Sequence, residues 1–170
     1  MRRSVVAGVL FFTLVPLGAC AATPSKLEIQ QMSPDEAKQR VLEYYADVLG
    51  ALGADQWTEM NSWGPCQLDG RSDEVQWTFS AQRFAQLAEP PGLVGDSIAS
   101  DWRERGLNPS AASNHAPTDD VFLVSDPPSL SGLRADGGFT QISLDPRSAL
   151  FRAKSACVPG RLEDMDPPEG

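Results

Sequence analysis

His115 is the only histidine of the chain, and it lies four residues before the Asp119-Asp120 pair. Imidazole titrates near neutral pH, and a neighbouring carboxylate can orient it as a general base or as a metal ligand. A zinc site would need further histidine or cysteine ligands, and the sequence offers no second histidine. The stretch from Asn108 to Asp119 has the Ser, Asn and Pro content of a loop. We therefore interpret His115 as an exposed loop residue, without a catalytic or metal-binding role.

The other reactive side chains form no familiar catalytic arrangement. The sequence has neither a Gly-x-Ser-x-Gly elbow nor a Ser-x-x-Lys pair. Gly137-Gly138 has no lysine or helix after it, which favours a hairpin turn over a phosphate-binding loop. None of the carboxylate pairs Asp35-Glu36, Asp119-Asp120 and Glu163-Asp164 has the spacing of a calcium loop. We expect no enzymatic activity, no metal site and no cofactor.

Four tryptophans are candidates for a ligand-binding surface, since large amphipathic rings suit such surfaces. Trp77 and Trp102 lie on periodic apolar faces, which predicts that they belong to the core. Trp57 and Trp63 flank an expected loop next to Cys66. They are the ligand-binding candidates of this sequence.

The first 20 residues have the three-part layout of a secretory signal peptide. Arg2 and Arg3 form a basic start, the apolar stretch runs from Val5 to Leu17, and small residues precede Cys20. This apolar stretch is too short for a permanent membrane-spanning helix. The pair Arg2-Arg3 also occurs in twin-arginine export signals, but the rest of that motif is missing.

Leu17, Gly18, Ala19 and Cys20 resemble the lipobox of bacterial lipoproteins. The resemblance implies that residues 1–19 are removed, that Cys20 carries a diacylglycerol thioether, and that its new amine is acylated, with palmitate for example. A thiol is the nucleophile that holds a lipid as a stable thioether, and two or three acyl chains anchor a protein stably. Residues 20–32 are then the lipidated cysteine and a tether. The alternative is an ordinary secretory leader.

Assigning Cys20 to lipid leaves Cys66 and Cys157 as an even pair in an exported, oxidising setting. We expect one disulfide between them, with two free buried thiols as the alternative. A disulfide that closes the loop from Cys66 to Cys157 stabilises the fold by about 4 to 5 kcal/mol in the chain-entropy model.

The charge balance excludes one class of partner. The formal net charge is −9 and the pI is near 4.5. Without Arg2 and Arg3, 12 basic residues remain against 23 acidic ones. Such a surface repels phosphate backbones, so nucleic-acid binding is not expected.

Two helices are predicted. Ser33-Pro34-Asp35-Glu36 has the pattern of a capping box, and apolar residues recur at spacings of three and four up to Leu52, before Gly53. A second helix is expected from Pro90-Pro91-Gly92 to just before Gly106, with Val94, Ile98 and Trp102 on one face.

Alternating patterns and turn residues predict strands, and Ala54 to Asp73 is expected to be a loop. The expected strands are 74–80, 121–125, 132–135, 139–144 and 150–157. We expect a single α+β domain over residues 33–160, with two helices packed on one face of a four- to five-stranded, mainly antiparallel sheet. Residues 161–170 are expected to be a disordered acidic tail.

The segments "MSPDEAKQRVLEYYADVLGALG", "DWRERGL", "GGFTQISLD" and "SALFRAKSACVPG" resemble the small cell-envelope lipoproteins of mycobacteria and other actinobacteria. The resemblance implies a location on the extracytoplasmic face of the cell membrane and implies no catalytic residue. We therefore expect a lipid-anchored, non-enzymatic protein that binds an envelope protein or a small ligand. The alternatives are an enzyme with an unfamiliar carboxylate or histidine site, and a purely structural envelope protein.

Overall fold

The computed structural model describes residues 32–71, 73–115, 120–128 and 132–165. The expected leader, the lipobox with Cys20, and the tether up to residue 31 lie outside this range. The chain from Gln31 onward forms one compact unit. Within the described residues, no helix has the length and apolar character needed to cross a membrane.

Both predicted helices are present. Helix α1 spans Pro34–Leu52, and its capping box is formed as expected. The Glu36 backbone N–H donates to Ser33 Oγ (3.2 Å), and the Ser33 N–H donates to Glu36 Oε2 (2.7 Å). Gly53, with φ of 84°, ends the helix in a conformation that glycine adopts without strain. Helix α2 spans Pro91–Glu104.

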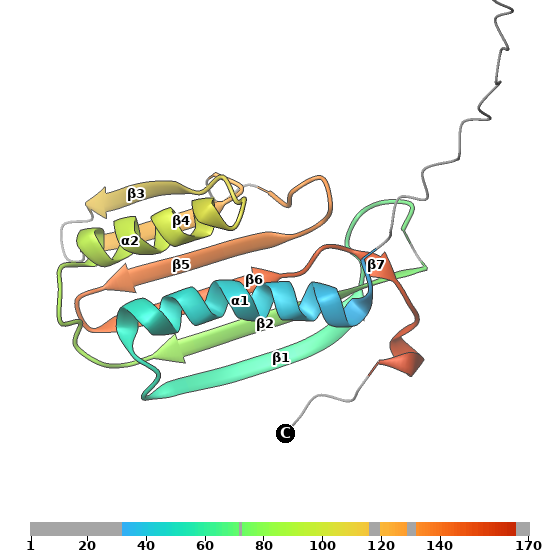
Figure 1. The fold of residues 1–170 in the computed structure, drawn as a ribbon, viewed down its shortest axis with the longest axis horizontal. Helices are drawn as coiled ribbons and strands as arrows, with labels where there is room; N and C mark the ends of the chain where they lie inside the picture. The colour runs from blue at the N-terminus through green and yellow to red at the C-terminus, as the bar shows by residue number, and fades with distance from the viewer. Residues whose placement is uncertain (1–31, 72, 116–119, 129–131, 166–170) are drawn as a thin grey trace, which may run out of the picture. The chain divides into compact units, whose positions relative to one another are not determined.

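One sheet of seven strands lies behind the two helices (Figure 1). Its path order is β1-β2-β6-β5-β4-β3, each neighbouring pair is antiparallel, and β7 pairs with the beginning of β2. The strands are β1 (Trp57–Pro65), β2 (Glu74–Arg83), β3 (Ser110–His115), β4 (Asp120–Asp126), β5 (Phe139–Asp145), β6 (Ser148–Lys154) and β7 (Val158–Pro159). The α+β class is confirmed, and the strand number exceeds the expected four to five.

Two expected loops are strands at the sheet edges, and here the prediction was wrong. Residues 54–73 contain β1, which pairs with β2 along its whole length, and residues 108–119 contain β3, which pairs with β4. An edge strand is paired on one side and buries few side chains. The sequence of such a strand is therefore polar, and it lacks the alternation of apolar and polar residues that marks a half-buried strand.

The last third of the chain also differs in detail. Gly132–Ala135, expected as a strand, contains no strand. The strand expected over 150–157 begins at Ser148 and ends at Lys154, and the short β7 follows Cys157. The structure also places the short helix η1 (Leu162–Asp164) within the expected tail.

The core lies between the helices and the sheet face that they cover. Trp77 and Trp102 are 2% and 0% exposed, as predicted, and Phe151 and Ile142 are fully buried beside them. The Trp102 indole N–H donates to the carbonyl of Tyr44 (3.1 Å), which satisfies its one polar atom and links α2 to α1. Each large apolar side chain buried here contributes about 1.5 to 3 kcal/mol.

The expected disulfide is confirmed. Cys66 and Cys157 are bonded, with Cα atoms 5.4 Å apart. Cys66 follows β1 and Cys157 precedes β7, so the bond joins two connections at one end of the sheet. It ties together segments 91 residues apart in the chain.

A small second cluster lies at the same end of the domain. Its buried members are Ala37, Val75 and Val158. Met32, the first described residue, and Met165, the last, both pack against it. The beginning and the end of the described chain therefore share one set of contacts.

Candidate functional site

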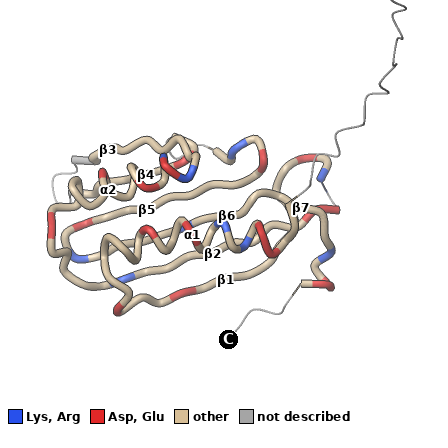
Figure 2. Tube along the Cα trace, viewed as in Figure 1, with Lys and Arg blue, Asp and Glu red and all other residues tan. Residues whose placement is uncertain are grey.

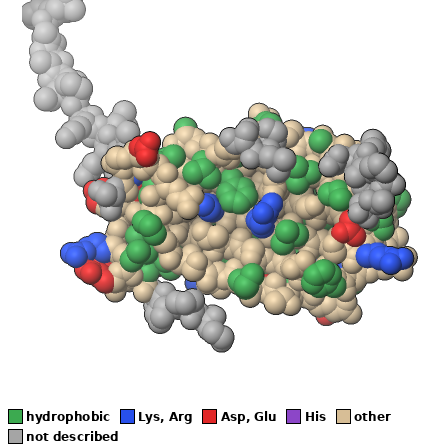
Figure 3. Space-filling model, turned by 180° about the vertical axis from the view of Figure 1, so that it is seen from behind, with side chains coloured by type: hydrophobic (Ala, Val, Ile, Leu, Met, Phe, Trp, Pro, Cys, Tyr) green, Lys and Arg blue, Asp and Glu red, His purple; other side chains and the backbone are tan. Residues whose placement is uncertain are grey.

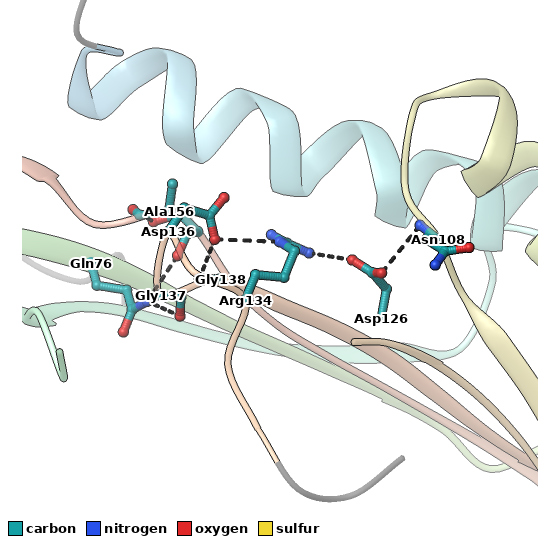
Figure 4. A network of polar contacts seen from close by, with 9 residues as sticks. Gln76, Asn108, Asp126, Arg134, Asp136, Gly137, Gly138 and Ala156 are labelled. Carbon is teal, nitrogen blue, oxygen red and sulfur yellow. Dashed lines mark hydrogen bonds and ion pairs between the residues drawn. The ribbon is translucent and has the colours of Figure 1, made fainter. Parts of the chain in front are cut away.

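A pocket of about 320 Å³ lies beside α1 and is the candidate site. One wall comes from α1, and the other walls come from the α2–β3 connection, the end of β4, the turn before β5 and the β6–β7 connection. We call it the α1 pocket. Figure 4 shows the polar network on its sheet side.

A buried ion pair stands in this pocket. Asp126, the last residue of β4, is 4% exposed. Its Oδ2 accepts a hydrogen bond from Arg134 Nη1 (2.9 Å), and its Oδ1 accepts one from the backbone N–H of Asn108 (3.1 Å). A carboxylate that leaves water needs such partners, because an unpaired buried charge is strongly destabilising.

The Arg134 side chain is held by a tight turn. The Arg134 N–H donates to the Gly138 carbonyl (2.7 Å), and the Gly137 N–H donates to the Arg134 carbonyl (2.9 Å). Asp136 Oδ1 accepts from the Gly138 N–H (2.8 Å) and lies 3.4 Å from Arg134 Nε. A turn is present at Gly137-Gly138, but it is not the expected hairpin turn, because no strand precedes it in residues 132–138. The turn aims the guanidinium at Asp126 (Figure 4).

Residues around the disulfide hold this turn in place through hydrogen bonds. The Cys157 N–H donates to the Asp136 carbonyl (2.8 Å), and the Gln76 amide donates to the Gly137 carbonyl (2.6 Å) and the Ser155 carbonyl (2.8 Å). Gly137 has a φ of 88°, and a Cβ there would lie 2.5 Å from Cys157 Sγ. Glycine is required at this position both for its backbone conformation and for space.

Tyr44 and Arg40 bring further donors to the pocket from α1. Burial raises the pKa of Tyr44, whereas the nearby Arg134 and Arg40 act to lower it. The phenol therefore stays protonated at neutral pH and can donate a hydrogen bond. Among the described residues, neither the Tyr44 hydroxyl nor the Arg40 guanidinium has a hydrogen-bond or ion-pair partner.

The pocket offers more hydrogen-bond donors than acceptors. The two oxygens of Asp126 each accept one bond already, and Asp136 Oδ1 accepts two contacts. Arg134 uses two of its five N–H groups in these contacts. Apolar side chains of Met32, Val41 and Leu107 line the same pocket. Such a lining suits a small molecule with an oxyanion and an apolar body.

A second, broader hollow lies between the two helices. It measures about 630 Å³ and is lined by small side chains and by Asp47, Asp101, Glu104 and Arg105. Arg105 donates two hydrogen bonds to Asp47, at 2.6 and 2.8 Å. Its cation is thereby already engaged, and the remaining groups are the solvated acids of a helix surface.

No family model, curated protein or solved structure matches this chain. The assignment of a site therefore depends on the geometry of the chain itself.

The two tryptophans proposed from the sequence do not line the α1 pocket. Trp57 donates through its indole N–H to the Gly53 carbonyl (2.9 Å), and its ring meets Tyr45 edge to face. Trp63 packs against the hydrophobic core. Both are half-buried on β1, where they cover the side of the core. His115 ends β3, and its side chain lies outside the described residues.

Within the described part of the chain, one group of side chains has metal-site spacing: Cys66, Glu74 and Cys157. Both cysteines are in the disulfide, so their sulfurs are not thiolate ligands. The group therefore reflects the position of Glu74 beside the disulfide, where it pairs with Arg71 (3.1 Å).

The residues of the α1 pocket do not stand out in the sequence. Asp126 and Arg134 are eight residues apart, and Asn108 lies 18 residues before Asp126. A signal was nevertheless present in β4, where the helix-facing positions Phe122 and Val124 are followed by Asp126. A carboxylate that continues an apolar face of a strand must have a buried partner.

Proposed function

We propose that this chain is a lipid-anchored protein of the extracytoplasmic cell envelope that binds a small organic oxyanion in the α1 pocket and catalyses no reaction. The ligand carries a carboxylate or phosphate group and an apolar body. The observation that carries the proposal is the excess of hydrogen-bond donors in a pocket of about 320 Å³. That volume falls in the usual range of small-molecule sites.

The charged groups of the pocket support binding rather than proton transfer. Asp126 accepts hydrogen bonds on both oxygens and is fixed as the partner of Arg134. A general base instead needs a free oxygen that faces the reacting atom. Arg40 and Tyr44 complement an anionic group, because charge-assisted hydrogen bonds to a guanidinium are strong and directional. The apolar wall then contributes by burial of the ligand body.

The ligand proposal is tested with hexanoate and hexyl phosphate as probes, and with hexan-1-ol as a neutral molecule with the same apolar body. Binding is followed by amide chemical shifts in NMR titrations of the chain from Ala21. We expect saturable shifts at Arg134, Asn108 and the first turns of α1 for the two anions, and binding at least about tenfold weaker for the alcohol.

Two arginine variants provide the matched comparison. Arg40→Gln removes an unpaired pocket cation and should weaken hexanoate binding about tenfold or more. Arg103→Gln removes the same charge from the exposed end of α2, outside the pocket, and should change nothing. Equal affinity for hexanoate and hexan-1-ol, or equal effects of the two substitutions, would refute the anion site.

The anchor is tested separately in cells. Metabolic labelling with a fatty-acid analogue should mark the wild-type protein and leave the Cys20→Ala form unmarked. Labelling of both forms would rule out Cys20 as the lipid site. This result and the titrations are independent, so either half of the proposal can fail alone.

A further inference from the structure

The face of the sheet opposite the helices has a composition unlike the rest of the molecule. Figure 3 shows basic and hydrophobic side chains in the middle of this face and acidic ones toward its margins. We call it the open face. Its middle is built by cross-strand neighbours, because Arg152 on β6 pairs with Ser80 on β2 and with Gln141 on β5. Lys154 lies two residues further along β6, beside Thr78.

The two cations of the open face lack acidic partners. Arg152 donates a hydrogen bond to the neutral Gln141 amide (2.6 Å), and Lys154 donates one to the Gln67 amide. Neither makes an ion pair with a described residue. Burial lowers the pKa of Lys154, and no nearby carboxylate acts against that effect.

Acidic residues occupy only the ends of the open face in the described strands. Glu74 begins β2 and is paired with Arg71. Asp145 ends β5, and its carboxylate accepts hydrogen bonds from Arg147 N–H and the Ser148 hydroxyl within the turn to β6. Both carboxylates are thereby engaged away from Arg152 and Lys154.

The helical layer has the opposite charge. Helices α1 and α2 carry seven acidic and three basic residues, and Figure 2 shows the acidic ones along both helices. On this side Arg105 is paired with Asp47 (2.6 Å), whereas Arg40 has no ion-pair partner among the described residues. In a chain with 23 acidic and 14 basic residues, the open face differs from the helical layer because its middle carries two cations and no described acidic residue.

Apolar side chains surround the two cations. Met60 on β1 is 69% exposed and pairs with Ser80, next to Arg152. Leu150 and Phe139 are half-buried on the neighbouring positions of β6 and β5. Phe84, 74% exposed, lies further from the two cations, beyond the Arg83–Ala149 pair at the end of β2. Exposed apolar groups beside unpaired bases are the two features that attract a protein to an anionic bilayer surface.

We propose that the open face docks on the surface of a bilayer that contains anionic phospholipid. A second copy is a poor occupant, because symmetric packing with its axis at the middle of the two open faces places Arg152 and Lys154 against the same cations of the partner. An anionic lipid headgroup instead supplies the missing counter-charge to both. Each base near such a surface is worth about a fivefold change in binding, so a domain already held at the membrane is oriented by two of them.

The test holds the chain from Ala21 on vesicles by an amino-terminal hexahistidine tag and a nickel-chelating lipid, so that it does not depend on lipidation of Cys20. The vesicles are phosphatidylcholine alone or phosphatidylcholine with phosphatidylglycerol. Oxidation of Met60 by hydroxyl radicals is measured by mass spectrometry. We expect oxidation at least about threefold slower on the anionic vesicles, and loss of this protection in about 0.5 M salt.

A matched pair of double variants completes the test. Arg152→Gln with Lys154→Gln should restore the oxidation rate of Met60, whereas Arg103→Gln with Arg161→Gln removes the same charge elsewhere and should leave the protection intact. Circular dichroism checks that both variants are folded. Equal oxidation on the two vesicle types, equal effects of the two variants, or the same protection in concentrated protein without vesicles would overturn the proposal.

Discussion

Replacement of Asp126 by alanine tests whether its ion pair holds the α1 pocket together. The substitution removes the buried acceptor of the Asn108 N–H, which costs about 1 to 3 kcal/mol. It also removes the shorter of two carboxylate contacts of Arg134. The Arg134 side chain is 22% exposed and keeps Asp136, so this second loss is about 1 kcal/mol. We expect the free energy of unfolding to fall by about 3 kcal/mol.

The assay is urea unfolding followed by tryptophan fluorescence, with the disulfide kept oxidised. For a slope of about 2 kcal/mol per molar urea, the midpoint should drop by about 1.5 M. The control is Asp136→Ala. Its side chain is 50% exposed, so its contact with Arg134 (3.4 Å) is worth less than about 1 kcal/mol, and the lost hydrogen bond from the Gly138 N–H (2.8 Å) adds about 0.5 to 1.5 kcal/mol. The midpoint should therefore drop less than for Asp126→Ala.

The same urea midpoint for the two variants would refute this reasoning. If Asp126→Ala and Asp136→Ala lower the midpoint equally, burial does not distinguish the two carboxylates. An unchanged midpoint for Asp126→Ala would show that water replaces its hydrogen bonds without cost, and the pocket would then be solvated in the native state.

Two further predictions concern the fold. Replacing Cys66 and Cys157 by alanine should lower the free energy of unfolding by about 4 to 5 kcal/mol in chemical denaturation, because the bond closes a loop across 91 residues; a loss below about 1 kcal/mol would contradict the entropic account. Gly95→Ala should destabilise by about 1 to 3 kcal/mol, because its Cβ would lie 2.3 Å from the Phe122 ring between α2 and β4. A Cβ at Gly50 on α1 would have no atom within 4 Å, so Gly50→Ala should raise the free energy of unfolding by about 0.5 to 1 kcal/mol in the same assay. If Gly50→Ala destabilised the protein more than Gly95→Ala, the packing described would be contradicted.

The elements with one buried face could be predicted from the sequence. In α1 the apolar residues recur at helical spacing, and the capping box at Ser33 sets the start. In β2 the residues Val75, Trp77 and Phe79 alternate with polar ones, since the helices cover one side of a central strand. The disulfide followed from the number of cysteines in an expected exported chain.

The edge strands and the pocket could not be predicted by the same reasoning. In β1 the exposed Met60 and the half-buried Asn61 give no alternation, because one side of the strand has no neighbour. The pocket depends on Asp126, Arg134 and Asn108, which the sheet and the α2–β3 connection bring together. Their contact is a property of the tertiary structure, and no local spacing encodes it.

The shared packing of Met32 and Met165 makes the described chain nearly a closed ring in space. A circular permutant can therefore be made in which a short linker joins these two residues. Its new ends lie at the exposed Ala88–Glu89 peptide, between β2 and α2. This permutant keeps every strand pairing of the sheet. In such a permutant, a tether attached before α2 would hold the domain from the opposite end of the sheet. The end of the sheet at which the tether is attached can thus be changed without a change in the fold.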